Sequence, residues 1–193
     1  MKKIIYLGML FSSFYGFSQL REKGTIELTP QIGYASANYY GEDIADGNKP
    51  ISSATFGVGS DYFFNNRWSL RSGIFLQTMG TKTAYFQEKL NYVTIPVNAN
   101  WHFGSTRKWN LNFGLNAGFL TSAKTNETDI KSLVNSTQFG IGYGIGYKIE
   151  VSENFSILLD TQGMTGLSEI AKSSEYSFKN AFSTINVGGV IKL

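Results

Sequence analysis

The sequence contains no cysteine and a single histidine among its 193 residues. Without cysteine there are no disulfides, no thiolate zinc sites and no cysteine nucleophiles. A large charge surplus is also missing, because 17 Lys and Arg oppose 14 Asp and Glu. No basic cluster is present that would attract nucleic acid. These absences exclude thiol chemistry and leave nothing to indicate a nucleic-acid partner.

The sequence also lacks an apolar run long enough to span a bilayer, and the run near its start is too short for this. It extends from Ile4 to Phe11, after Lys2 and Lys3 and before the small residue Ser18. This order is typical of a secretory signal peptide. We predict cleavage after Ser18, which leaves residues 19–193 as one mature domain with 15 basic and 14 acidic side chains. An exported chain of this length without disulfides must be stabilised in another way.

What the sequence has in abundance is alternation with a period of two. The stretch FGIGYGIGYKI, residues 139–149, places glycine at every second position, with aromatic or aliphatic residues between: Gly140, Gly142, Gly144 and Gly146. A dinucleotide-binding loop would need G-x-G-x-x-G at the start of a helix, which this spacing does not match. A period of two instead predicts a β-strand that is apolar on one face and nearly bare on the other.

Similar alternation recurs in eight runs along the chain. They cover residues 25–34, 53–64, 68–77, 93–103, 109–119, 139–149, 155–162 and 182–193. Tight turns follow the second, fourth and sixth runs, whereas long polar segments at 37–50, 79–91, 122–136 and 164–180 follow the others. Greek-key connections of a sandwich would not sort loop lengths by end in this way. The pattern predicts an all-β fold, an eight-stranded antiparallel up-and-down transmembrane β-barrel.

The direction of the apolar face distinguishes a membrane barrel from a soluble, lipocalin-like barrel, which remains the alternative. The apolar faces carry no charged residue, and the opposite faces are too poor in charge for a water-exposed exterior. Aromatic residues gather at both strand ends, as in the girdles of membrane barrels. The short-turn set is Tyr62, Phe64, Trp68, Trp101, Phe103, Trp109, Tyr147 and Phe155, and the long-loop set is Tyr34, Tyr92, Phe119 and Phe139. We therefore expect the apolar face to contact lipid.

The segment YVTIPVNANWHFG, residues 92–104, lies between a long loop and a tight turn. It resembles the Tyr-x-x-Ile-Pro stretch of the outer-membrane β-barrel domain family of Bacteroidota, which includes PorT-like proteins and small barrels of the OmpA/OmpX type. The resemblance covers about residues 24 to 193 and implies an outer-membrane barrel without a shared active site. Leu193 departs from the terminal Phe common in such barrels.

Charged and polar residues on the other face are expected to lie inside the barrel. The predicted lumen-facing set is Glu27, Asp61, Arg71, His102, Gly140, Gly142, Gly144, Gly146, Lys148, Glu150, Asp160 and Lys192. An eight-stranded barrel is only wide enough for its own side chains, so these charges are expected to form ion pairs that plug it. A gated solute path lined by them is the alternative. The space beside the four glycines is expected to be filled by Arg71, Phe75 or His102.

Two other arrangements suggest chemistry but are weak. His102 with Ser69 or Ser156 and Asp160 has the composition of a hydrolase triad, but these residues lie on the inward face, where a substrate has no evident access. A hydrogen-bonded lumen histidine is the expectation. The loop residues Glu42, Asp43, Asp46 and Asn48 offer oxygen ligands for a cation, but not with EF-hand spacing. No catalytic residue, metal or cofactor is predicted.

The sequence thus predicts a monomeric integral protein of the cell outer membrane, surrounded by lipid. Its long loops are expected outside the cell, with the tight turns and both termini in the periplasm. The predicted role is structural or interactive, through long loops or the periplasmic rim, with a partner such as a secretion complex or an adhesion target. The competing hypotheses are binding or transport of a small ligand in the lumen, and a lipid-modifying enzyme.

Overall fold

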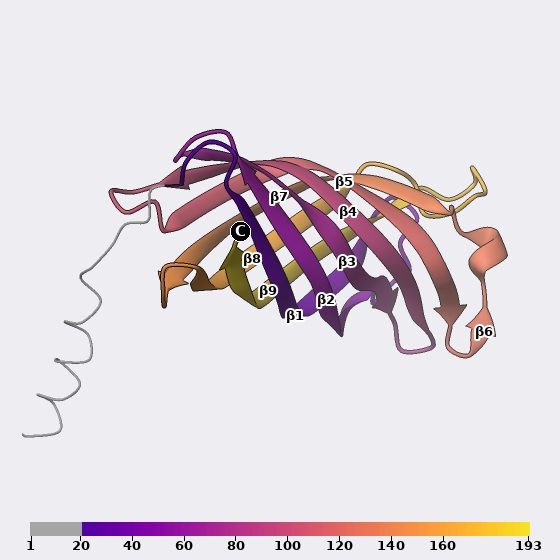
Figure 1. The fold of residues 1–193 in the computed structure, drawn as a ribbon. Coiled ribbons are helices and arrows are strands. Elements are labelled where there is room, and N and C mark those ends of the chain that lie inside the picture. Colours follow the sequence, from indigo (N-terminus) through magenta and orange to yellow (C-terminus); the bar gives the residue numbers. More distant parts are fainter. Residues whose placement is uncertain (1–20) are drawn as a thin grey trace, which may run out of the picture.

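The computed structural model describes residues 21–193, and the predicted signal peptide lies outside this part. Eight long strands of the described residues form a barrel (Figure 1). They are β1 (Ile26–Gly41), β2 (Lys49–Phe63), β3 (Trp68–Lys82), β4 (Gln87–Phe103), β5 (Trp109–Thr125), β7 (Thr137–Glu150), β8 (Phe155–Gly166) and β9 (Phe178–Lys192). The two-residue strand β6 (Thr128–Asp129) and the short 3-10 helix η1 (Lys131–Leu133) lie in the connection between β5 and β7.

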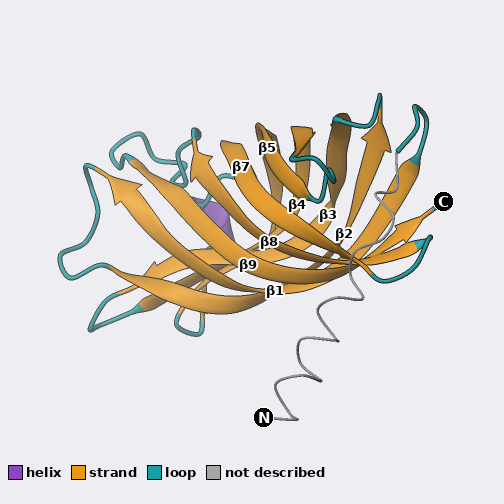
Figure 2. Ribbon diagram, turned by 90° about the vertical axis from the view of Figure 1, so that its left-hand side faces the viewer, coloured by secondary structure: helices purple, strands orange, loops and turns teal. Residues whose placement is uncertain are grey.

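The barrel is closed and has up-and-down topology, which confirms the predicted fold class. Each long strand pairs antiparallel with the long strands that precede and follow it in the chain. Pairing of β1 with β9 joins the first and last strands (Figure 2). Closure leaves no long strand with an open edge, because the backbone N–H and C=O groups of every one have a neighbour on both sides. In the described residues, no helix is both long and apolar enough to cross a membrane.

The predicted tight turns join β2 to β3, β4 to β5 and β7 to β8. They occupy residues 64–67, 104–108 and 151–154, and together they define the short-turn end of the barrel. Asn65 shapes the first turn, since its side-chain oxygen accepts hydrogen bonds from the backbone N–H groups of Arg67 and Trp68. The other connections lie at the opposite end, here called the long-loop end.

The outside of the barrel near the short turns is apolar. Side chains such as Ile74, Leu115 and Ile185 are 60%, 66% and 71% exposed. A belt of aromatic rings follows this end across β3, β4, β5 and β7, with successive ring contacts along Trp68, Trp101, Phe103, Trp109 and Tyr147 at centroid distances of 4.8–6.3 Å. Exposed apolar surface on this scale is not tolerated by a soluble monomer, so it must be covered by lipid or protein.

The second aromatic set is only partly as predicted. Tyr34, Phe119 and Phe139 are exposed on the outside, but Tyr92 points inward and is 2% exposed. The pairing register of β4 with β5 shifts between Asn91 and Tyr92. Leu90 and Tyr92 continue the inward row of β4 and belong to the buried apolar cluster. Tyr92 is therefore a core residue and not part of a girdle.

The long polar segments predicted from the sequence are partly strand at their ends, which shortens the predicted loops. The residues between long strands at the long-loop end are only 42–48, 83–86, 126–136 and 167–177. Towards the long loops, beyond the apolar outer surface, the alternation continues, but the apolar side chains now point into the barrel and the polar ones point outward. In β1, Ala35, Ala37 and Tyr39 are buried while Ser36 and Asn38 face outward. In this part of the barrel, as in a soluble β-protein, the hydrophobic core lies inside and polar side chains face outward.

Candidate functional site

The interior of the barrel has a polar half and an apolar half. Near the short turns it contains buried ions and amides. Towards the long loops it contains an apolar cluster. A small polar cavity lies between them, and a larger pocket lies among the loops above the cluster. Each of these four regions is a candidate site.

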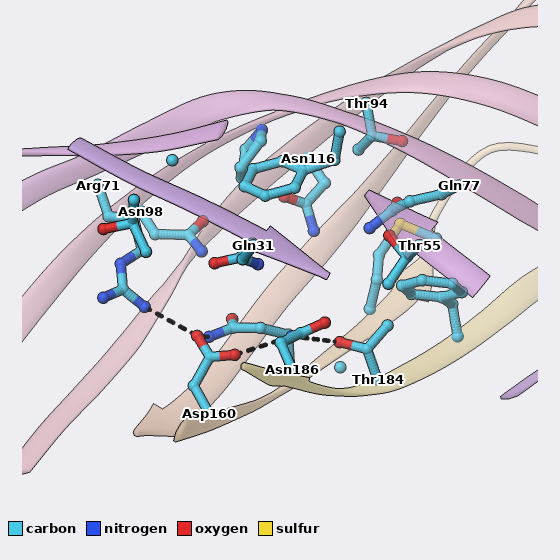
Figure 3. Close-up of a pocket in the computed structure, with 18 of the residues that line it drawn as sticks. Gln31, Thr55, Arg71, Gln77, Thr94, Asn98, Asn116, Asp160, Thr184 and Asn186 are labelled. Carbon is cyan, nitrogen blue, oxygen red and sulfur yellow. Dashed lines mark hydrogen bonds and ion pairs between the residues drawn. The ribbon is translucent and has the colours of Figure 1, made fainter. Parts of the chain in front are cut away.

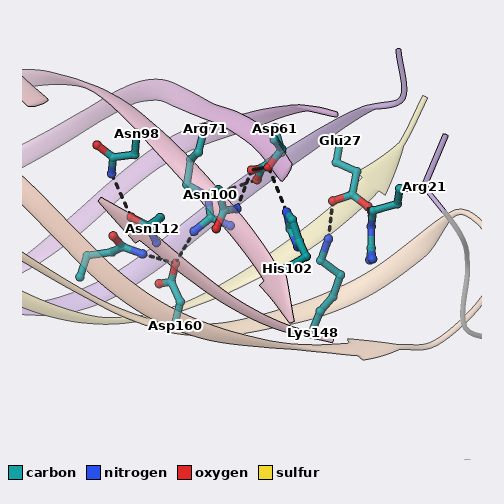
Figure 4. A network of polar contacts seen from close by, with 12 residues as sticks. Arg21, Glu27, Asp61, Arg71, Asn98, Asn100, His102, Asn112, Lys148 and Asp160 are labelled. Atoms are coloured by element: carbon teal, nitrogen blue, oxygen red, sulfur yellow. Dashed lines mark hydrogen bonds and ion pairs between the residues drawn. The ribbon is translucent and has the colours of Figure 1, made fainter. Parts of the chain in front are cut away.

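The outermost ion group closes the short-turn end. Glu27 of β1 accepts a hydrogen bond from Arg21 Nε at 2.7 Å and forms an ion pair with Lys148 of β7 (Figure 4). Both cations also lie over the ring of Phe63, with centroid distances of 5.4 Å for Arg21 and 5.8 Å for Lys148. All three ionic side chains are at most 4% exposed. One carboxylate between two cations satisfies the charges in a place where an unpaired ion would be costly.

A second ion group lies deeper in the barrel. Arg71 of β3 bonds Asp61 of β2 at 3.2 Å and Asp160 of β8 at 3.3 Å, so it spans the lumen between opposite walls (Figure 4). Asp61 also accepts hydrogen bonds from Ser69 and Asn100 at 2.7 and 2.8 Å. Asp160 accepts another from Asn186 at 2.8 Å. The side chains of the two groups are at most 10% exposed, and their ion pairs link β1, β2, β3, β7 and β8 across the polar half.

His102 and Ser69 do form a hydrogen bond, at 2.9 Å between the imidazole Nε2 and the hydroxyl. Asp61 bonds the same hydroxyl, whereas the Nδ1 atom of His102 makes no hydrogen bond to any described residue. A catalytic triad needs the acid on the second imidazole nitrogen, and it needs access for substrate. Ser69 and His102 are each 1% exposed. This arrangement is a buried hydrogen-bond chain: it lacks the acid on Nδ1 that a triad requires, and both side chains are closed to a substrate.

The remaining predicted interior residues lie as follows. Glu150 forms an ion pair with Lys108 at 3.2 Å, and Lys192 is half-buried at the short-turn end. The four glycines of β7 are buried. Their bare side is filled by Asn110, Asn116, Gln162 and Met164, whose atoms lie within 3 Å of where a Cβ would stand. The expectation that Arg71, Phe75 or His102 fills this space is wrong, because the atoms nearest to all four glycines belong to the neighbouring strands β5 and β8.

The small cavity between the two halves has a volume of about 60 Å³. Its walls are mainly amides, hydroxyls and the second ion group (Figure 3). Two amide oxygens that line it, those of Asn98 and Asn116, have no hydrogen-bond partner among the described residues. A polar space of this size holds a few water molecules, which would satisfy such atoms. It is too small for a solute.

The apolar half is packed by side chains from most of the barrel strands. Tyr39, Ile51, Met79, Leu90, Tyr92 and Phe182 are its large members, and each is at most 6% exposed. Val134 and Ile170, from the loops after β5 and β8, cover the cluster from above. The long-loop end is thus closed by hydrophobic packing, as the other end is closed by ions.

The pocket above this cluster has a volume of about 760 Å³ and is lined by residues of all four long-loop connections. Its inner wall includes the rings of Tyr39 and Phe178, whose centroids are 5.2 Å apart. The predicted acidic loop borders it, but Asp43 accepts a hydrogen bond from the Ser177 backbone N–H and Asn48 bonds Thr81. No group of three or more His, Asp or Glu side chains suited to a metal ion occurs in residues 21–193.

Comparison with protein families identifies the fold independently of its geometry. Residues 17–172 match the model of the outer membrane protein beta-barrel domain. The chain belongs to this family. It is therefore an outer-membrane β-barrel protein, and the apolar outer surface with its aromatic belt is the part that the membrane surrounds. A search of curated proteins finds no significant match.

Solved structures of bacterial outer-membrane proteins share the fold. OprG from Pseudomonas aeruginosa is 12% identical, with 90% of this chain and 97% of that chain covered and a TM-score of 0.57. Neisserial surface protein A is 15% identical, with 86% and 97% covered and a TM-score of 0.56. Ail of Yersinia pestis, in complex with the heparin analogue sucrose octasulfate, is 17% identical, with 88% and 99% covered and a TM-score of 0.50. At these identities the similarity shows the fold alone.

Proposed function

We propose that this protein is a sealed outer-membrane barrel that neither conducts solutes nor catalyses a reaction, and that it binds a partner at its long-loop end. The observation that carries the proposal is the filling of the lumen from both sides. The ion groups of Glu27 and Arg71 occupy one half and the apolar cluster the other. A gated solute path would require both to rearrange, and the enclosed space between them is only about 60 Å³.

The long-loop end is favoured as the contact region because its loops expose apolar side chains to water. Ile44, Leu133 and Tyr176 come from three different loops and are 42%, 66% and 53% exposed. Tyr85, in the fourth connection, is 92% exposed. Exposed apolar groups outside the membrane region are a usual mark of a binding surface. The resemblance to PorT-like barrels suggests a secretion complex as one class of partner, and an adhesion target is another.

Binding at this end requires it to face the outside of the cell, which can be tested by thiol labelling. The chain has no cysteine, so a single substitution introduces the only thiol. Ala84→Cys lies in the loop after β3, and Glu153→Cys lies in the turn after β7; both positions are exposed. A membrane-impermeant maleimide added to intact cells should label Ala84→Cys, and Glu153→Cys only after the outer membrane is permeabilised. The reverse pattern would refute the proposal.

A further inference from the structure

The pocket at the long-loop end has the construction of a small-molecule site. Its volume of about 760 Å³ lies within the roughly 300–1,000 Å³ typical of such sites. Its floor is continuous with the apolar cluster, since Tyr39, Val134 and Ile170 belong to both. A molecule that enters from outside therefore meets a closed hydrophobic floor and has no path onward through the barrel.

The mouth of the pocket is apolar as well. Ile44, Leu133 and Tyr176 line it, one from each of three loops, and all three remain exposed. Leaving three large apolar side chains in water on separate loops costs hydrophobic free energy that a bound apolar body would recover. A pocket of this volume between four loops fits a small molecule better than the flat surface of a folded protein.

Two polar groups inside the pocket specify where a ligand would be held. The hydroxyl of Tyr39 is buried and makes no hydrogen bond of normal geometry with the described residues. Glu88 is half-buried on the same wall, and its carboxylate is close enough to that hydroxyl for an electrostatic interaction and a weak hydrogen bond. One Glu88 oxygen accepts a hydrogen bond from Thr125 at 3.1 Å. A donor placed between Tyr39 and Glu88 would satisfy the hydroxyl and pair with the carboxylate.

The Glu88 carboxylate is the main charge available to a ligand in the pocket, because the other two charged side chains that line it are engaged in hydrogen bonds. Lys172 is the one cation that lines the pocket among the described residues, and its ammonium group donates to the backbone oxygen of Ser132 at 2.9 Å. Asp43 is held by its bond from Ser177. A ligand amine is favoured here over a carboxylate, which would approach Glu88 with like charge.

We infer that the pocket binds a small amphiphilic amine, with its apolar body between the loops and its amino group between Tyr39 and Glu88. The inference rests on the proposed function, because it names the class of partner for the same long-loop end. Such a molecule would bind and dissociate from the outer side without crossing the barrel.

Fluorescence titration with aminoanthracene tests this site directly. The folded protein is placed in phosphatidylcholine nanodiscs, and the signal of empty nanodiscs is subtracted. Ala45→Trp puts a large ring on the pocket wall, whereas Ala84→Trp makes the same change at an exposed loop position that does not line it. We expect probe binding about tenfold weaker in Ala45→Trp, because the ring occupies ligand space, and unchanged in Ala84→Trp. Equal binding by both variants, or none by the wild type, would overturn the inference.

Competition by decylamine and undecanoate, which share the same alkyl chain and differ in the head group, tests the assignment of the amine. Decylamine should displace the probe at a concentration about tenfold lower than undecanoate, and Glu88→Gln should remove most of that difference. Equal displacement by the two would refute the role of Glu88. The thiol-labelling pattern of Ala84→Cys and Glu153→Cys does not depend on the pocket. If labelling succeeds and probe binding fails, the small-molecule site is wrong while the proposed contact end stands.

Discussion

At the scale of single residues, the ion group around Glu27 illustrates how the barrel tolerates charge in its interior. Glu27 is 3% exposed and has Arg21 and Lys148 as partners. The net contribution of such a group to folding is small, because desolvation offsets the attraction. Removing one member is expected to lower the stability strongly, because the remaining charges stay buried without an opposite charge.

Glu27→Gln should therefore be strongly destabilising. It leaves two buried cations without their carboxylate, which costs about 3–5 kcal/mol of unfolding free energy. Glu169→Gln is the matched control, because Glu169 pairs with Lys179 at side-chain exposures of 37% and 31% and should lose less than about 1 kcal/mol. Urea unfolding of both variants in lipid vesicles measures the difference. Similar losses in the two would contradict the assignment of Glu27 to a buried ion group.

At the scale of strands, glycines on the inward face allow neighbouring strands and side chains to approach each other. A Cβ on Gly114 of β5 would stand 2.1 Å from the Val97 carbonyl oxygen and 2.6 Å from the Cα of Asn98. Both atoms belong to the backbone of β4, so relief requires the pair of strands to separate. At Gly59 of β2 the nearest atom to such a Cβ is 3.6 Å away.

These distances predict opposite outcomes for the same substitution. Gly114→Ala should lower stability by about 1–3 kcal/mol or more through overpacking, whereas Gly59→Ala should change it little. The folded fraction can be read from the shift in gel mobility between unheated and boiled samples. Folding of Gly114→Ala at the wild-type level would show that the β4–β5 pair is more open than the structure indicates.

The change of side along each strand gives a second prediction at this scale. Ile145 of β7 faces outward within the apolar surface, whereas Ser183 of β9 faces outward beside Ser36, where the outer face becomes polar. Ile145→Lys should impair insertion, because it places a lysine in the hydrocarbon region, where the cost rises to about 2–4 kcal/mol at the bilayer midplane. Ser183→Lys should insert normally. Refolding yields in vesicles compare the two, and equal yields would mean that the membrane boundary is misplaced.

The strands also show what the sequence could reveal and what it could not. Alternation in the eight runs was sufficient to predict the number of strands, because it depends on local periodicity. Their order followed from the sorting of short turns and long segments to opposite ends. The same periodicity continues in residues 35–41 of β1, but there the apolar residues point into the barrel and the polar ones point outward. In the sequence such a polar row looks like a loop, so the end of the strand was not predicted. Arg21 was missed because it precedes the first alternating run, so no periodicity indicates which way its side chain points. Its burial depends on contacts with Glu27 and Phe63 that form only in the folded barrel. The loop pocket was missed for a similar reason, since it is formed by segments that meet only in the folded barrel.

At the scale of the whole molecule, the barrel is divided along its axis. One part is surrounded by the membrane and has a polar interior, and the other extends beyond the membrane with an apolar interior. This division closes the lumen twice, by ion pairs and by hydrophobic packing. It also provides a packed base for the four connections at the long-loop end, where the proposed binding pocket lies.

The central claim is that the barrel is sealed, and electrical recording on planar bilayers tests it most directly. The refolded protein is first shown by its gel mobility shift to be folded, and it is then added to a bilayer in concentrated potassium chloride. We predict no steady conductance steps, because both halves of the lumen are filled and the space between them is only about 60 Å³. Stable, voltage-independent conductance steps in proportion to the amount of folded protein would contradict the account.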